Sequence, residues 1–325
     1  PGLFSIGDTI CTKEEKKALP RIEVDEPTVS MLFSKNISPL AGRDGKMVTS
    51  AKIWERLQKE ALRNVSIRIE KNMDDTFTVK GRGEFQMAII VEEMRREGFE
   101  MAISKPQVVV KEIDGIQQEP YEQVVIDVEE EHQGSIMEEV GNSRAEMTNM
   151  DPDGKGRVRL EFIAPARGLI GFRGLFLTLT SGTGILTNVF DHYGPLQTSL
   201  TSNRQNGVLV SMVTGKALGF ALYNLQERGR MFIGPATEVY EGMIVGLHSR
   251  DNDLAVNPTK AKQLTNIRAS GTDEAIVLTP HIKHTLEQAL EFIEDDELVE
   301  VTPTSIRFRK KHLTENERKR AARNG

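Results

Sequence analysis

One order of elements occurs twice in the chain, and this repeat constrains the fold more than any other feature. Residues 28–110 show the pattern strand, helix, strand, strand, helix, strand, and residues 115–194 show it again. In the first copy Val29, Met31 and Phe33 alternate with polar neighbours, as in a half-buried strand. Ser50 is the expected N-cap of the first helix, and Gly98 is the expected end of the second. Two split β-α-β units in series are therefore the predicted core.

The pattern changes after Gly194 to short β-type runs separated by Gly and Pro. We expect a strand over 274–278, a helix with Thr279 as N-cap and Pro280 at its first position, and a strand over 305–308. The predicted fold class is α+β: two ferredoxin-like βαββαβ domains in series, followed by a mostly β C-terminal domain with one clear helix.

Charge is distributed unevenly along the 325 residues. The formal net charge is −6, yet residues 307–323 hold eight Lys or Arg against two Glu, which leaves a net charge of about −12 on the rest. A basic end of this kind is more often solvated than a binding element. Local positive clusters decide what a polyanion meets, so the acidic total does not exclude RNA as a partner.

Cys11 is the only cysteine, which excludes an internal disulfide framework and a multi-cysteine zinc site and fits a reducing cytosol. The apolar runs, such as "AIVL" at 275–278, are far shorter than the ~20 residues of a membrane helix. The chain starts at Pro1 without a charged and apolar leader. We expect a fragment of a cytoplasmic protein.

The segment Ser249–Gly271 has too few apolar side chains, too irregularly spaced, to predict a strand or an amphipathic helix. It is rich in basic and amide side chains: Arg250, Lys260, Lys262 and Arg268, with Asn252, Asn257, Gln263 and Asn266. A long loop without regular structure inside a compact domain is either disordered or functional.

The usual signatures of catalysis and of phosphate loops are missing. No G-x-x-x-x-G-K-[ST] motif occurs, and "GRGEFQ" at 81 and "SGTG" at 181 fit strand-to-helix turns better than phosphate loops. His281 and His284 lie three apart on the predicted helix, but without a third ligand we interpret them as solvated or capping residues. We expect no catalytic residue, no metal site and no cofactor in this chain.

Several stretches resemble the C-terminal half of translational GTPases. "LFSIGDTICTKEEKKALPRIEVDEPTVSMLFSK" at 3–35, "GRGEFQMAIIVEEMRREGFEM" at 81–101 and "APARGLIGFRGLFLTLTSGTGILTNVFDHYGPL" at 164–196 are similar to the elongation factor G group. The chain passes directly from one βαββαβ unit to the next and continues after Tyr193. Together with "VNPTKAKQLTNIRASGTDEA" at 256–275, this resembles the TypA/BipA family, over nearly the whole chain.

The resemblance implies an architecture. Residues 1–25 would be the end of a β-barrel domain and a linker, 26–114 a domain like the third of elongation factor G, and 115–194 one like its fifth. Residues 195–310 would form a family-specific C-terminal domain, and 311–325 a basic tail.

The resemblance also implies a function. The intact protein would hydrolyse GTP with Mg on an N-terminal G domain, which this chain lacks, so the chain itself would not be an enzyme. Its partners would be both ribosomal subunits at the factor-binding site, rRNA and the acceptor end of an A-site tRNA, in stress adaptation and large-subunit assembly. We expect a cytoplasmic monomer that does not bind a membrane.

The loop Ser249–Gly271 is the segment suited to RNA contact. Lys and Arg neutralise phosphates, and Asn hydrogen-bonds bases and 2′-hydroxyls. The candidate RNA-binding residues are Arg250, Asn257, Lys260, Lys262, Asn266 and Arg268 in the loop, with Arg167 and Arg173 in "PARGLIGFRG". The loop contains no aromatic residue, so stacking of a base on a ring is not expected of it.

Other functions stay open at this point. A LepA-like translation factor also lacks the inserted domain, although its C-terminal domain differs. Tandem ferredoxin-like domains also occur in small-molecule regulatory modules, which would require a defined pocket. A protein-interaction scaffold would require a sizeable exposed apolar patch. Fold alone does not separate these classes.

Overall fold

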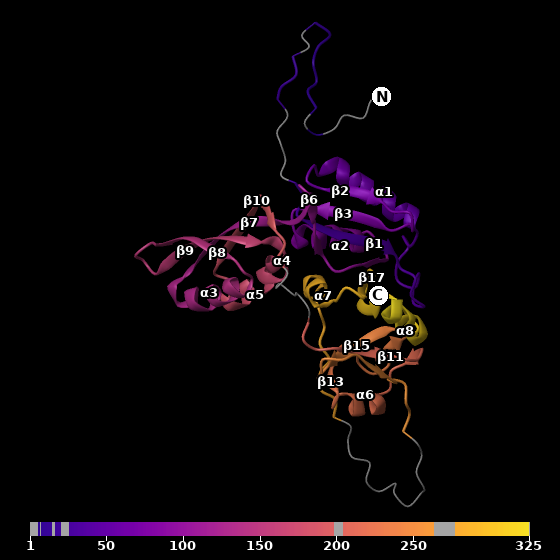
Figure 1. Ribbon diagram of the computed structural model, residues 1–325. Coiled ribbons are helices and arrows are strands. Elements are labelled where there is room, and N and C mark those ends of the chain that lie inside the picture. The colour runs from indigo at the N-terminus through magenta and orange to yellow at the C-terminus, as the bar shows by residue number, and fades with distance from the viewer. Residues whose placement is uncertain are drawn as a thin grey trace, which may run out of the picture. The chain divides into compact units, whose positions relative to one another are not determined.

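The computed structural model describes residues 6, 8–14, 17–20, 26–197, 204–262 and 277–324. It divides into two compact units (Figure 1). The N-terminal unit contains 1–35, 47–99 and 106–202, and the C-terminal unit contains 36–46, 100–105 and 203–325. In the described parts, no helix combines the length and the apolar character needed to cross a bilayer.

The first module of the N-terminal unit is built on antiparallel strands. β3 pairs with β1 on one side and β2 on the other, and β5 pairs with the opposite edge of β1. Its elements are β1 (Val29–Lys35), α1 (Ser50–Arg63), β2 (Arg68–Lys71), β3 (Phe77–Gly81), α2 (Glu84–Arg96) and β5 (Gln107–Val108). The alternation in β1 is confirmed, because Val29, Met31 and Phe33 are buried. The cap of α1 is Thr49, one residue before the expected Ser50, and its side chain accepts the Lys52 N–H at 3.4 Å.

The second module has the strand order β10-β7-β9-β8, with β6 on the edge of β7. Its strands are β6 (Lys111–Ile113), β7 (Ile116–Glu129), β8 (Glu146–Pro152), β9 (Arg157–Pro165) and β10 (Ile185–Pro195). Its helices are η1 (Glu130–His132), α3 (Gln133–Asn142), α4 (Ala166–Leu169) and α5 (Phe172–Leu179). The helices α3 and α5 lie along one face of this sheet (Figure 1). Their apolar residues form one core with the inward residues of β7 and β9. This order is that of a split β-α-β unit.

The run 106–113 is divided between the two sheets. It forms β5, which pairs with β1, and β6, which pairs with β7 of the second sheet. Its consecutive valines, residues 108–110, favour extended backbone but carry no information on which sheet supplies the partner.

The C-terminal unit is a sheet in the order β16-β11-β15-β18-β17-β4, with β13 paired to β15. The strands are β4 (Met101–Ile103), β11 (Val208–Ser211), β13 (Gly229–Met231), β15 (Met243–His248), β16 (Leu254–Val256), β17 (Glu297–Val301) and β18 (Ile306–Lys310). A separate pair joins β12 (Gly215–Lys216) to β14 (Glu238–Val239). The helices are α6 (Gly219–Leu225), α7 (Leu286–Phe292) and α8 (Glu315–Asn324). The predicted α+β class and the series of modules are confirmed.

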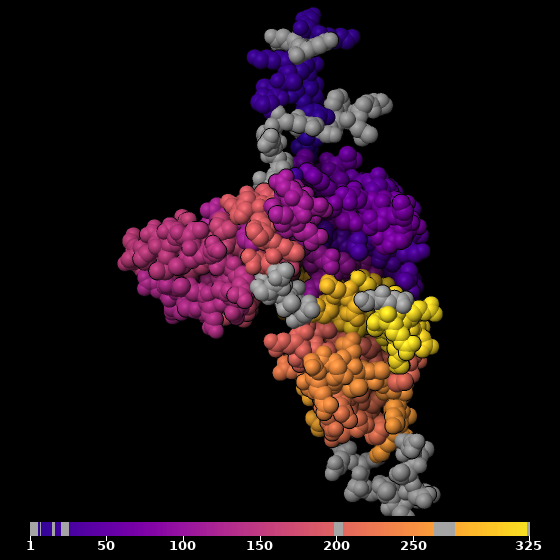
Figure 2. Space-filling model, in the orientation of Figure 1, coloured from indigo at the N-terminus to yellow at the C-terminus, as the bar shows by residue number. Residues whose placement is uncertain are grey.

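One local expectation in this unit is wrong, and another is not tested. The helix expected after Thr279 begins only at Leu286, where Thr285 and Gln288 form a capping box that satisfies two N–H groups. The chain before it is held extended, because the Ile282 N–H donates to the Met231 carbonyl at 2.9 Å. The strand expected over 274–278 falls mostly outside the described residues. The basic end forms α8, which lies on the surface (Figure 2).

A buried carboxylate accepts hydrogen bonds from three separate segments of the C-terminal unit. Glu300 of β17 is fully buried and accepts hydrogen bonds from Arg307 Nη1 at 2.8 Å, Tyr240 Oη at 2.6 Å and Asn36 Nδ2 at 2.9 Å. Burial and the charge of Glu300 raise the pKa of Tyr240 well above its usual value, so the phenol remains a donor. A buried charge is tolerated only with such partners.

Replacing Glu300 with Ala should lower the free energy of unfolding of the C-terminal unit by about 3–5 kcal/mol, because it leaves the buried Tyr240 hydroxyl and Asn36 amide without their acceptor and leaves Arg307 with Asp44 as its remaining carboxylate partner. Urea denaturation followed by circular dichroism measures this. Trp54, the sole tryptophan, lies in the N-terminal unit and reports that unit separately by fluorescence.

The matched control is Glu238→Ala, which removes a carboxylate from an exposed ion pair with Arg43 in the same unit. Its loss should be below about 1 kcal/mol. Equal losses for Glu300→Ala and Glu238→Ala would contradict the role given to burial.

Candidate nucleic-acid interface

The segment Ser249–Gly271 contains a short strand, contrary to the expectation of a loop without regular structure. Leu254–Val256 form β16, which runs parallel to β11 with Leu209 opposite Leu254. Val256 is 5% exposed and belongs to the core of the unit. A parallel strand of three residues with one inward side chain is too short for periodicity to reveal.

Asp253 fixes the start of this strand. Its Oδ1 accepts the Val208 N–H at 2.9 Å, and its Oδ2 forms an ion pair with Lys310 Nζ at 2.6 Å. His248 Nδ1 contacts the Asn252 carbonyl oxygen at 2.6 Å. Gly207 allows the backbone at Asn252 to pass close to it, since a Cβ at residue 207 would lie 2.2 Å from the Asn252 backbone. The backbone at the start of the segment is therefore fixed by the contacts of both Asn252 and Asp253.

The exit of β16 is fixed by a turn. The Asn257 side-chain oxygen accepts the Thr259 N–H at 2.9 Å and the Thr259 hydroxyl at 2.8 Å. The Pro258 carbonyl accepts the Leu218 N–H at 2.9 Å, which ties the turn to the start of α6. Lys260 is exposed and directly follows this turn, whose backbone is fixed by these hydrogen bonds.

A groove of about 660 Å³ lies between this turn and α6. It is lined by Phe220, Ala221, Asn224 and Leu225 of α6 and by Asn257, Lys260, Ala261 and Lys262 of the segment. Among the described residues, the lining contains two ammonium groups and no carboxylate, although the chain as a whole is acidic. The positive charge of these described residues favours a phosphate here.

The candidate residues of the loop separate into three groups. Asn257, Lys260 and Lys262 line the groove together, and their role in RNA binding remains a prediction. Arg250 is exposed at the turn before β16 and does not line the groove. Asn266 and Arg268 lie outside the described residues, so their roles remain predictions.

Sequence reasoning missed the contribution of α6. The interval 217–229 shows apolar side chains three apart, at Leu222 and Leu225, which is a helical spacing. A helix of seven residues is too short for such spacing to decide against strand. The helix supplies the aromatic side chain, Phe220, that the loop itself lacks.

Arg167 and Arg173 lie in the second module, and both have partners. Arg167 forms an ion pair of 2.9 Å with the buried carboxylate of Glu119. Arg173 donates to the Leu186 carbonyl at 3.3 Å and lies 5.7 Å from the centre of the Phe85 ring. Their roles as phosphate contacts remain predictions.

Arg173 also lines a cleft of about 630 Å³ between the two modules of the N-terminal unit. The lining includes the carboxylates of Glu60, Glu84, Glu93 and Glu122 against the guanidinium groups of Arg82 and Arg173. Burial raises the pKa of Glu122. Glu84 accepts the Gly171 N–H at 2.8 and 3.0 Å. The carboxylates make this cleft a poorer environment for phosphate than the groove at α6.

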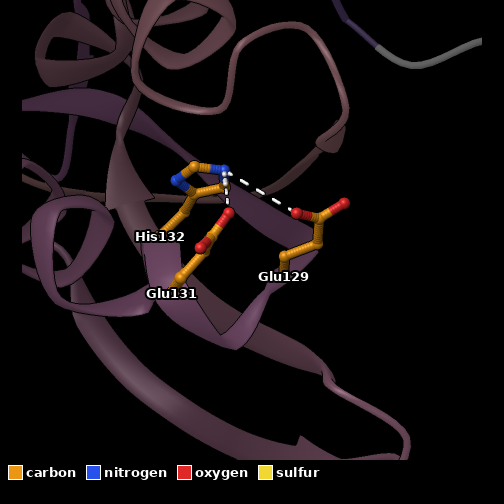
Figure 3. Close-up of side chains that lie close together, drawn as sticks. All are labelled: Glu129, Glu131 and His132. Atoms are coloured by element: carbon orange, nitrogen blue, oxygen red, sulfur yellow. Dashed lines mark ion pairs between the residues drawn. The ribbon is translucent and has the colours of Figure 1, made fainter.

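One cluster in the described residues has the composition of a metal site. Glu129, Glu131 and His132 stand at the end of β7, with His132 Nε2 at 3.9 and 3.6 Å from the two carboxylates (Figure 3). Glu131 is exposed, and one imidazole between two carboxylates is also an ordinary surface ion pair. The geometry requires no metal.

His281 and His284 do not share a helix face, because both precede α7. His284 lies among three aromatic rings, with ring centres 4.6 Å from Phe232, 5.5 Å from Phe292 and 5.0 Å from Phe308. Burial lowers the pKa of His284. This histidine therefore packs the core rather than binding a ligand.

Comparison with known proteins supplies the family. The TypA/BipA C-terminal domain matches residues 206–315, and the elongation factor G C-terminus matches residues 116–204. The chain belongs to the TypA/BipA family. Both family regions cover modules that the structure describes, and the first includes β16, the groove and α6.

Three curated relatives carry the name "Large ribosomal subunit assembly factor BipA". The relative from Escherichia coli strain K12 is 58% identical over 323 residues, which is 99% of this chain and 53% of the relative. The one from Haemophilus influenzae is 59% identical over 323 residues, 99% of this chain and 52% of the relative. The one from Buchnera aphidicola is 56% identical over 322 residues, 99% and 53%. The chain spans about half the length of the curated relatives it matches.

Lowering the pH should weaken the C-terminal unit through His284. Its pKa in the folded protein is below the ordinary 6.5, so the unfolded chain binds the proton first. The stability from the neutral ring is therefore complete above about pH 6.5 and is lost as the pH falls toward the folded-state pKa. Thermal unfolding between about pH 8 and pH 5 measures this.

The control for this measurement is His284→Phe, which keeps an aromatic ring among the three phenylalanines and removes the titration. The wild-type protein should lose more of its unfolding temperature on acidification than this variant. Identical pH profiles would show that His284 does not titrate against folding.

Proposed function

We propose that this chain acts within a longer TypA/BipA protein as a part that binds RNA of the large ribosomal subunit during its assembly. The observation that carries this is the groove at α6, which Lys260 and Lys262 line after a turn tied to α6, and whose described lining contains no carboxylate. The printed name of the curated relatives, large ribosomal subunit assembly factor, supports the same partner.

The finer parts of the proposal follow the family. The chain binds at the factor site between the subunits, and the segment Ser249–Gly271 contacts the acceptor end of an A-site tRNA. GTP and Mg bind a G domain outside this chain, so the chain contributes binding and no catalysis. The protein works in the cytoplasm, as a monomer, in adaptation to stress.

Positive charge at the segment is the basis of this binding. The Lys260 ammonium neutralises a phosphate, and the Asn257 amide nitrogen hydrogen-bonds a sugar or a base edge. Affinity of this kind depends on salt, because each contact releases a counterion from the RNA. A module that binds a small metabolite would show no such dependence.

The test is sedimentation of the chain with 50S and 70S ribosomes over a series of salt concentrations. Lys260→Ala/Lys262→Ala should bind more weakly, and its slope of log affinity against log salt should be shallower by about 0.7 to 0.9 for each lost phosphate contact. Adding Arg268→Ala tests whether that residue contributes a further contact.

The matched control is Lys283→Ala/Lys311→Ala, which removes the same charge from exposed lysines that do not line the groove. Its slope should stay close to that of the wild type. If both double variants changed the slope equally, net charge rather than the groove would control binding, and the proposal would fail.

A further inference from the structure

We propose that the groove at α6 binds an unpaired nucleotide of an RNA strand, with its base stacked on the ring of Phe220. This inference rests on the proposed function and adds the ligand and the residue that recognises its base. The basic segment alone contains no aromatic side chain, but the fold places one beside it.

The groove presents three chemical features side by side. Phe220 is half-buried and lines the wall of the groove. The amides of Asn224 and Asn257 stand on the two sides, and Lys260 and Lys262 supply positive charge. A nucleotide needs a surface for a flat base, polar groups for the base edge, and a cation for the phosphate. The lining offers all three.

The two amides offer complementary groups. The Asn224 Nδ2 group donates one N–H to the Phe220 carbonyl at 2.9 Å, which leaves its second N–H and its side-chain oxygen to face a ligand. The Asn257 oxygen accepts the two Thr259 bonds, which leaves its Nδ2 group as the remaining donor. A base edge that both donates and accepts fits between such groups.

The charge beside the ring suits the backbone of an RNA strand. Lys260 is exposed and follows a turn that is fixed to α6, so its ammonium group suits a phosphate next to the stacked base. A duplex keeps its bases stacked on one another, and only an unpaired base exposes a face to an aromatic ring. The occupant is therefore a single-stranded end or loop of RNA.

Stacking and charge are separable by experiment. Fluorescence anisotropy compares two RNA hairpins, one with a single-stranded 3′ end and one whose 3′ end carries the same phosphates but abasic sugars. The wild-type chain should prefer the base-bearing end by about 5- to 10-fold, the lower part of the range for base–aromatic stacking, because Phe220 is half-buried. Phe220→Leu should abolish this preference and leave the salt slope unchanged.

Three further variants make the result specific. Phe220→Trp should keep the preference, which separates loss of the ring from damage to the fold. Tyr223→Leu, an exposed ring on the same helix that does not line the groove, should also keep it. Lys260→Ala/Lys262→Ala should flatten the salt slope for both RNAs and keep the preference for bases.

The possible failures are distinct. If Phe220→Leu retained the preference while the lysine variant lost salt dependence, stacking would be overturned and the proposed function would stand. If the wild type bound neither hairpin, both would be overturned. If adenosine monophosphate competed as strongly as the base-bearing end, the groove would be a mononucleotide site, and the assignment to an RNA strand would be wrong.

Discussion

The ion pair between Asp253 and Lys310 connects the candidate interface to the core of the C-terminal unit. Lys310 is 4% exposed and also contacts Glu297, which is completely buried and paired with Arg204 at 2.9 Å. Burial alone would lower the pKa of Lys310, but the carboxylates around it outweigh that effect and raise the pKa. Breaking such a group by removing one partner leaves an uncompensated charge inside the protein. The position of the segment before the groove therefore depends on charges buried in the sheet.

This arrangement explains how a segment rich in polar side chains holds a fixed place. Val256 contributes the inward apolar side chain of β16, and one such residue gives little hydrophobic stabilisation. The rest of the stabilisation of this position comes from backbone pairing with β11 and from the hydrogen bond that joins Pro258 to Leu218. The backbone before Lys260 is thus fixed. Binding a phosphate therefore costs this lysine less conformational entropy than it would cost a lysine on an unsupported loop.

The βαββαβ modules were predictable because their strands and helices repeat apolar residues over intervals long enough to define a period. The same reasoning fails where the partner is distant or the element short. Leu254–Val256 become a strand only through pairing with β11, some 45 residues earlier. The start of α7 was misplaced because Pro280 is a favourable first helical residue, whereas a hydrogen bond from Ile282 to Met231 keeps that segment extended. Neither contact is visible in local sequence.

For the same reason, only part of the candidate interface could be predicted from the sequence. The lysines and amides of Ser249–Gly271 stand out by composition, whereas Phe220 precedes them by 40 residues and looks like an ordinary apolar residue. Composition also ranks Arg167 and Arg173 with the lysines, yet Glu119 already compensates the charge of Arg167. What distinguishes the groove is that its described lining gathers two lysines with amide and apolar side chains, a property of the folded surface. In an acidic protein, a polyanion is attracted where the fold gathers basic side chains, and the fold rather than the number of basic residues determines where that occurs.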